Sequence, residues 1–406
     1  MTLLLWLLAL TQIPALRALA RYVPLPELAL PALLLLAAAA FAVLFNPPQR
    51  LRTVLFTPWP SLLVVVLLSL AIAYVYPLAD GLKTLGGGSD ADDALQLGGV
   101  ALWHLANPYA LTTYFGNPLS PGPGWLALYG PLALLGLQPL GTVGALCFAI
   151  WALRRVKISW PILNLLTLGW ASSLAVWELA TVGNDLPSFG LVLLGVLALL
   201  AQPRLSFNAL LLLAVVVGCL ATARISFFYL PLLLGFALLA VWPKRALWVA
   251  LLGFATMALW HGSFFILNPQ AYPPLHLLVR GETLISGAAW AGVFGVLGVT
   301  GVAMLYHWRW WNPYVHTALG LGVPLGVLAT AELASHGSLA AWEGATWLTP
   351  ALPVACMAVL TVWPLPRALA QSVGARPHTL PVKKAISVSK NQKAKRPPLA
   401  KGQRSR

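Results

Sequence analysis

Residues 186–201 read LPSFGLVLLGVLALLA, a run of sixteen positions without a charged side chain. Such a run approaches the length that crosses a bilayer as a helix, about 20 residues. Lipid offers the backbone no hydrogen-bond partners, so a spanning segment of this kind must be helical. Similar runs recur along almost the whole chain. The sequence therefore predicts an all-α fold, a polytopic transmembrane helical bundle.

Composition supports the same class. Of the 406 residues, 59% are hydrophobic and 9% are charged, too little polar surface to cover a soluble protein of this size. We count 3–19 as a retained span because no Lys or Arg precedes it and no clear small-x-small cleavage site is present. For 117–137 the sequence allows a re-entrant helix, an interfacial helix or another crossing. The twelve predicted spans are 3–19, 28–45, 60–77, 138–153, 160–180, 186–201, 206–223, 225–242, 246–267, 285–306, 314–334 and 346–364.

Positive charge predicts the orientation, because cytoplasmic connections carry an excess of Lys and Arg. With the N-terminus inside, the inner connections hold nine basic residues and the outer ones five, before the C-terminal tail is counted. We predict a multi-pass protein of the cell membrane with both termini cytoplasmic. The inner nine are Arg50, Arg52, Arg154, Arg155, Lys157, Arg204, Lys244, Arg245 and Arg309; the outer five are Arg17, Arg21, Lys83, Arg224 and Arg280.

Residues 366–406 form a second region with a different composition. They hold eleven of the 25 basic residues and no acid, so most of the net charge of +15 belongs to them. Their Lys, Pro and Ser content predicts a disordered basic cytoplasmic tail after a transmembrane domain at 1–365. The tail could hold anionic lipid head groups or simply fix the topology. Nucleic-acid binding is not expected, because no aromatic side chains interleave with the basic ones.

Acidic residues are concentrated in the predicted outer loop, 78–122. Four of the ten, Asp80, Asp90, Asp92 and Asp93, fall within fourteen positions. One interpretation is helix capping, by Ser89 or Asp90, of a helix that begins near Ala94, together with solvated loop charge. It does not explain three acids in four positions, because mutual repulsion destabilises such a loop.

The alternative interpretation is chemical. A carboxylate at the membrane surface can accept a proton from a hydroxyl that attacks an activated carbon. A neighbouring carboxylate can hold a divalent ion such as Mg²⁺ or Mn²⁺, for which Asp90 and Asp92 are the candidates. The loop also offers polar partners for a substrate: Asn107, Tyr109, Tyr114 and Asn117.

Asp90-x-Asp92, followed by Pro108-Tyr109 and Thr113-Tyr114, resembles the first luminal loop of the GT-C superfamily of glycosyltransferases. The similarity is to members that use polyprenyl- or dolichyl-phosphate mannose, and it is specific over about 86–131. The resemblance implies a GT-C-like fold and a catalytic role for the acidic group Asp90, Asp92 and Asp93. Two extra N-terminal helices and the stretch 118–124 depart from the family pattern.

Other polar residues on the predicted outer face could complete such a site. Arg224, Arg280 and His261 are candidates for binding a donor phosphate, and Asp185 for binding substrate. Each also has a simpler explanation: snorkelling for the arginines, a packed histidine, and helix capping for Asp185.

Taken together, the sequence predicts an enzyme that transfers a hexose, most plausibly mannose. The donor would be a polyprenyl-phosphate sugar, and the acceptor a glycan, lipid or protein at the extracytoplasmic face. The rival interpretation is a transporter or lipid flippase, a class that usually places ionisable residues near the membrane midplane.

Overall fold

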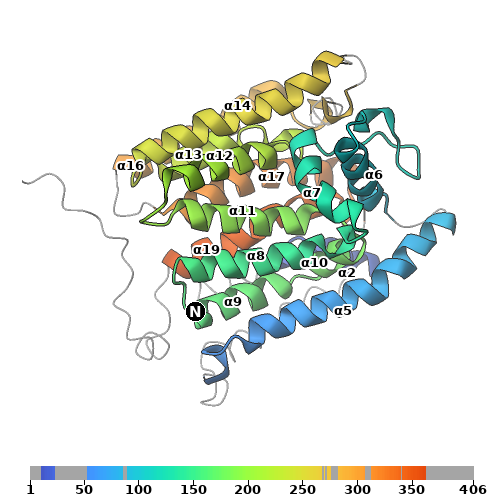
Figure 1. Ribbon diagram of the computed structural model, residues 1–406, viewed down its shortest axis with the longest axis horizontal. Coiled ribbons are helices and arrows are strands. Elements are labelled where there is room, and N and C mark those ends of the chain that lie inside the picture. Colours follow the sequence, from blue (N-terminus) through green and yellow to red (C-terminus); the bar gives the residue numbers. More distant parts are fainter. Residues whose placement is uncertain are drawn as a thin grey trace, which may run out of the picture.

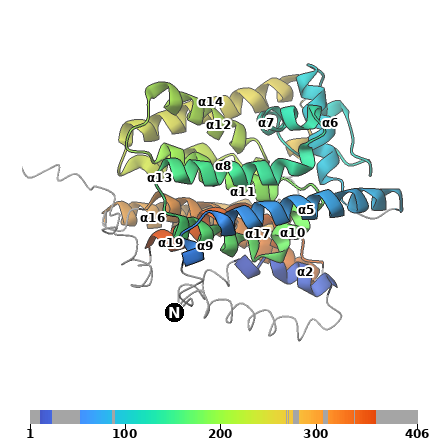
Figure 2. The same ribbon diagram turned by 60° about the horizontal axis from the view of Figure 1, so that its bottom comes forward.

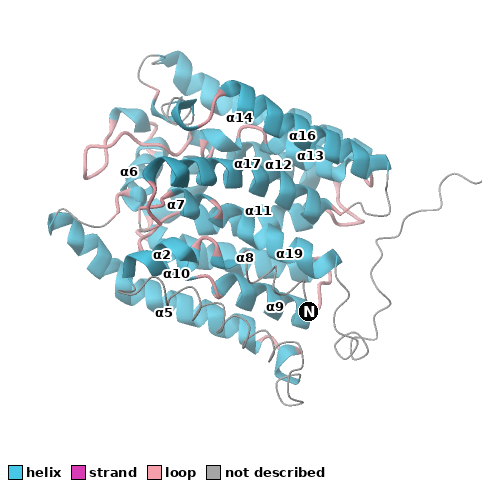
Figure 3. Cartoon of the chain, turned by 180° about the vertical axis from the view of Figure 1, so that it is seen from behind, coloured by secondary structure: helices cyan, strands magenta, loops and turns pink. Residues whose placement is uncertain are grey.

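The computed structural model describes residues 11–22, 53–85, 89–267, 269, 272–275, 282–306, 312–339 and 341–362. Across these ranges the chain is built from helices, and the all-α prediction is confirmed (Figure 3). One isolated antiparallel bridge, between Thr112 and Pro118, is the extended pairing found there. The predicted span 28–45 and the tail 366–406 lie outside the described residues.

The helices follow the apolar runs closely along the chain. In the first half they are α2 (Ala15–Tyr22), α5 (Trp59–Gly81), η1 (Leu82–Leu85), α6 (Ala91–Trp103), η2 (Pro108–Ala110), α7 (Pro123–Leu134), η3 (Gln138–Leu140), α8 (Gly141–Arg155), α9 (Trp160–Ala171) and α10 (Leu174–Thr181). The second half contains α11 (Leu186–Leu200), α12 (Phe207–Ala221), η4 (Ile225–Phe227), α13 (Leu230–Leu239), α14 (Pro243–Leu267), η6 (Pro273–Leu275), α16 (Gly287–Tyr306), α17 (Pro313–His336), α18 (Gly344–Trp347), η8 (Thr349–Ala351) and α19 (Leu352–Val362).

By length and apolar composition, four helical segments among the described residues can cross a membrane: Trp59–Leu85, Pro243–Leu267, Pro313–His336 and Gly344–Val362. The number rises to six if each of two bent helix pairs is one span. Four other apolar helices, such as Leu186–Leu200, are shorter. The protein is thus an all-helical, multi-pass membrane protein by these criteria. The described helices thus provide four to six of the twelve crossings that the sequence predicts.

The segment 117–137 forms α7, which meets the following helix, Gln138–Arg155, at a bend of 119°. Pro123 stands in the first turn of α7, where its missing N–H costs nothing. The second bent pair is α9 and α10, at 72°. Of the alternatives open for 117–137, the bend favours a broken span or a re-entrant loop over a separate straight crossing.

Helix α11 lies in the middle of the bundle, between α14 on one flank and α5 on the other (Figure 1). Nearly all of its residues are buried, and Phe189 stacks on Phe227 at 4.3 Å between ring centroids. At 15 residues it is about 22 Å long. The outer helices differ: α5 leaves side chains such as Leu63, Leu70 and Tyr74 exposed, as a lipid-facing helix does.

A buried asparagine fixes the start of α5. Asn164 of α9 donates from its Nδ2 to the carbonyls of Leu55 and Thr57, at 2.7 and 2.8 Å. Its Oδ1 accepts from the backbone N–H and the hydroxyl of Ser61. All four hydrogen-bonding positions of the amide are therefore satisfied, which makes its burial affordable. The far end of α5, whose last turn holds Asp80, lies at the other end of the bundle, on the side of α6 (Figure 2).

The two ends of α11 differ in charge. Asp185, just before α11, pairs with Arg224, whereas the carbonyl of Leu200, at the last turn, accepts from Arg245. We call the first the acidic end, since α6 and the last turn of α5 also bring their aspartates there (Figure 1). Six described bases lie near the opposite, basic end: Arg154, Arg155, Lys157, Arg204, Lys244 and Arg245.

Candidate functional site

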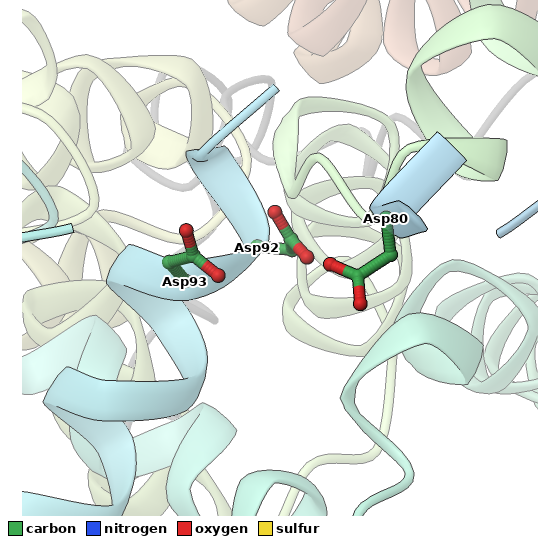
Figure 4. A group of neighbouring side chains, drawn as sticks. All are labelled: Asp80, Asp92 and Asp93. Atoms are coloured by element: carbon green, nitrogen blue, oxygen red, sulfur yellow. The ribbon is translucent and has the colours of Figure 1, made fainter. Parts of the chain in front are cut away.

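Three aspartates at the acidic end come from two helices. Asp80 lies in the last turn of α5, and Asp92 and Asp93 lie in the first turn of α6. Figure 4 shows their carboxylates facing a common centre. Helix α6 begins at Ala91, so the expected start near Ala94 was three residues late. The earlier start places two acids at the positive end of the helix dipole, which favours negative charge.

Lys83 occupies the centre of this group. Its Nζ lies 2.7 Å from Asp80 Oδ1, 2.8 Å from Asp92 Oδ2 and 2.8 Å from Asp93 Oδ1. The lysine is 5% exposed. An ammonium group donates charge-assisted hydrogen bonds, and here it lies within bonding distance of one oxygen each of Asp80 and Asp93 and of both oxygens of Asp92. We call Lys83, Asp80, Asp92 and Asp93 the Lys83 cluster.

Asp92 is the most enclosed of the four predicted loop acids, at 3% exposed. Its Oδ2 also accepts from the hydroxyl of Tyr76 at 2.7 Å. Burial raises the pKa of the Asp92 carboxyl, although hydrogen bonds from Lys83 and Tyr76 act in the opposite direction. Gly183 packs directly against it: a Cβ on this glycine would lie 2.8 Å from the Asp92 Cβ, and its φ is +71°. Only glycine fits this position without strain.

Asp90 has a different environment from the other three. It stands at the N-cap of α6, but its side chain makes no capping bond, so the capping interpretation does not describe its carboxylate. Asp90 Oδ2 instead accepts from Thr113 Oγ1 at 2.6 Å and Asn117 Nδ2 at 2.7 Å. No ion pair links Asp90 to a basic side chain among the described residues, and its carboxylate is partly exposed.

The returning loop completes this side of the site. The backbone N–H of Tyr114 donates to Asp93 Oδ2 at 3.2 Å, while its ring remains exposed. The structure therefore brings together Asp90, Asp92, Asp93, Tyr114 and Asn117, five of the predicted site residues.

Asn107 and Tyr109 lie beyond the other end of α6. Asn107 Oδ1 caps η2 by accepting from the Tyr109 N–H, and the Tyr109 hydroxyl donates to the Pro121 carbonyl. The Tyr109 ring packs edge-on against Tyr272 at 5.0 Å, and His261 Nδ1 lies 2.7 Å from the Tyr272 hydroxyl. Tyr109 and His261 thus share a neighbour.

An apolar cavity of about 640 Å³ opens near this second group, between α6, α7 and α14. None of the four loop aspartates lines it. Its wall consists of Leu102, Trp103, Leu105, Ala106, Asn107, Ala127, Trp260, Phe264 and Leu267. Of the predicted substrate-binding residues, Tyr114 and Asn117 therefore lie beside the aspartates, whereas Asn107 lines this cavity.

Asp185 and Arg224 bind one another. Arg224 donates to both carboxylate oxygens of Asp185, at 2.6 and 3.0 Å, and the indole N–H of Trp125 adds a bond of 2.6 Å. Asp185 is 1% exposed. Both terminal nitrogens of Arg224, a candidate for binding a donor phosphate, are bonded to Asp185. Arg280, the other arginine candidate, lies outside the described residues.

The carboxylates that converge are not the predicted metal pair. Asp80, Asp92 and Asp93 have ligand atoms within 4.8 Å of one another, whereas Asp90 bonds elsewhere. Hard oxygen donors suit Mg²⁺ or Mn²⁺. However, the Lys83 ammonium stands within 2.9 Å of all three carboxylates, at the point where an ion would bind. The residues as arranged do not fit a divalent cation.

Several residues of the site were not predicted from the sequence. Lys83, Tyr76 and Gly183 come from three segments, and Gln138 fixes the last by donating to the Gly183 carbonyl at 2.8 Å. One sequence signal was present: Lys83 follows Asp80 by three positions, a spacing that brings side chains together on a helix.

Comparisons with known proteins leave the family open. The chain matches no protein-family model, no curated protein and no solved structure. The residues and their geometry are therefore the basis for any statement about function.

Proposed function

We propose that this protein is a GT-C-like integral-membrane glycosyltransferase. In this proposal it transfers a hexose, with mannose as the first candidate, from a polyprenyl-phosphate donor to a glycan, lipid or protein acceptor. The supporting observation is Asp90, whose carboxylate is held by Thr113 and Asn117, is partly exposed and bonds to no described base. A carboxylate that is positioned but not neutralised can serve as a general base.

The proposed step needs only this one proton acceptor. As the acceptor hydroxyl oxygen forms a bond to the anomeric carbon, the bond from that carbon to the donor phosphate oxygen breaks. The hydroxyl proton passes to Asp90, and polyprenyl phosphate leaves with the bonding electron pair. Asp92 and Asp93 are paired with Lys83, so they suit a positioning role better than that of the base.

The membrane setting is part of the same proposal. A polyprenyl tail confines the donor to the bilayer while its head group reaches the acidic end. By the positive-inside rule, the basic end faces the cytoplasm and the acidic end the outside. The proposed topology retains twelve crossings, both termini in the cytoplasm and location in the cell membrane.

The direct test uses the purified protein in lipid nanodiscs with radiolabelled polyprenyl-phosphate mannose. Release of polyprenyl phosphate is followed with a panel of glycan, lipid and peptide acceptors. We expect donor consumption by the wild type and a loss of at least about 100-fold in Asp90→Asn, which removes the base. Glu343→Gln, an exposed acid elsewhere in the chain, serves as the control and should remain active.

Equal activity of Asp90→Asn and wild type would remove Asp90 as the base. No donor consumption with any acceptor would contradict the glycosyltransferase proposal. Movement of an intact labelled lipid across the membrane of proteoliposomes, without consumption, would favour the rival transporter or flippase.

A further inference from the structure

We infer that Lys83 is an internal counter-ion that takes the place of a divalent cation at the acidic end. Three carboxylates converge, with ligand atoms within 4.8 Å of one another. Such a group needs a positive charge at its centre, because like charges held this closely repel each other strongly in a partly buried setting. A metal ion or a basic side chain could supply it.

The geometry identifies which one does so. The Nζ of Lys83 lies 2.7 to 2.9 Å from oxygens of all three aspartates, and this is the distance range of charge-assisted hydrogen bonds. Mg²⁺ binds oxygen at about 2.0–2.1 Å and Ca²⁺ at about 2.3–2.6 Å. Either ion would need the point that the nitrogen occupies, so ion and ammonium exclude one another.

The position of Lys83 in the fold makes the ammonium a fixed group. It is supplied by η1, directly after α5, whose other end is fixed by Asn164. Gly183 packs against Asp92, and the Tyr76 hydroxyl donates a hydrogen bond to its carboxylate. The lysine therefore joins the end of α5 to the start of α6. Asp90 is the N-cap residue of that helix, so Lys83 acts as a positioning residue for it.

Two consequences follow from this role. The wild-type cluster should not bind divalent ions, and any activity should not depend on them. Removing the ammonium should leave three oxygen donors around a vacancy, which then becomes a divalent-cation site. The statement about catalysis rests on the proposed function, whereas the statement about ion binding does not.

The test compares wild type, Lys83→Ala and the double variant Lys83→Ala/Asp92→Asn, each purified in detergent. Thermal unfolding is recorded in EDTA and with MnCl₂, and bound Mn²⁺ is measured by electron paramagnetic resonance. We expect Mn²⁺ to raise the melting temperature of Lys83→Ala by at least about 2 °C. Wild type and the double variant should show no shift and no bound ion at the same concentration.

Lys83→Gln covers the case in which the alanine variant does not fold, because its slightly shorter side chain keeps amide N–H donors without the charge. In the transfer assay, we expect Lys83→Ala to lose at least tenfold in kcat with EDTA and to regain activity with Mn²⁺. Lys83→Arg should keep part of the activity in EDTA. A purely structural residue would not show rescue by an ion.

Two results would overturn the inference. One is Mn²⁺ binding by the wild type that disappears in Asp92→Asn, which would show that an ion enters with Lys83 present. The other is a folded Lys83→Ala or Lys83→Gln protein that gains no Mn²⁺ binding. If no variant and no wild type consumes donor, the glycosyltransferase proposal fails, and the ion-binding measurements still decide the role of Lys83.

Discussion

Asp185 and Arg224 form a two-pronged ion pair across 39 positions of sequence, with N–O distances of 2.6 and 3.0 Å. The indole N–H of Trp125 donates a further hydrogen bond to the Asp185 carboxylate. The pair joins the start of α11 to the turn between α12 and η4, both at the acidic end. Asp185 is buried and Arg224 is nearly so, with a side chain that is 16% exposed.

Breaking this pair should destabilise the protein strongly. In Arg224→Leu the buried Asp185 carboxylate loses its charged partner, which typically costs about 3–5 kcal/mol. We expect a large fall in the melting temperature in detergent. The double variant Asp185→Leu/Arg224→Leu should recover much of the loss, because it leaves no unpaired charge. An Arg224→Leu protein as stable as wild type, yet impaired only in donor binding, would instead support a phosphate-binding role for Arg224.

Gly183 and Gly136 provide a matched pair of glycines. Both have positive φ, +71° and +67°, but a Cβ meets Asp92 and Tyr76 at Gly183 and nothing within 4 Å at Gly136. Gly136→Ala should cost about 1 kcal/mol from backbone strain alone. Gly183→Ala should cost more, about 2 kcal/mol or above, and displace Asp92. Thermal unfolding of the two variants measures the difference, and equal losses would show that the contact with Asp92 has no energetic weight.

Asp92 gives the protein a specific pH dependence. Because burial raises the pKa of this carboxyl above its ordinary value of 3.8, the folded chain releases this proton at a higher pH than the unfolded chain does. The resulting stabilisation is present at low pH and is lost as the pH rises through the raised pKa.

We therefore expect the melting temperature of wild type, relative to Asp92→Asn, to fall as the pH increases through that window. The asparagine cannot ionise, so it removes this contribution while keeping the shape of the side chain. The measurement is thermal unfolding of both proteins from about pH 4 to about pH 8. A relative stability that rises with pH would mean that Lys83 and Tyr76 outweigh burial and hold the pKa low.

Orientation can be tested with single cysteines. Cys147 is exposed, whereas Cys219 and Cys356 are buried, so Cys147→Ala gives a suitable background. Leu105→Cys lies in an exposed turn after α6, and Lys157→Cys lies between α8 and α9. A membrane-impermeant maleimide should label the first in intact cells and the second only after permeabilisation. Labelling of both, or of Lys157→Cys alone, would contradict the proposed topology.

The sequence by itself determined the helical class and the position of most helices. Predicted spans such as 186–201, 246–267 and 314–334 correspond to α11, α14 and α17 within a few residues. This succeeded because a long apolar run must form its backbone hydrogen bonds within itself, which is a local requirement. The sequence also located the acidic stretch, since four aspartates in fourteen positions are visible without any structure.

Only the tertiary structure decided how the polar side chains pair. The sequence assigned Asp90 and Asp92 a common role, yet Asp90 bonds to Thr113 and Asn117 while Asp92 bonds to Lys83 and Tyr76. The sequence likewise made Arg224 a candidate for binding a donor phosphate, whereas in the folded chain Arg224 is bonded to Asp185. An ion pair depends on which helix ends lie close together in space, and the hydrophobic periodicity of the sequence does not show which ends do so.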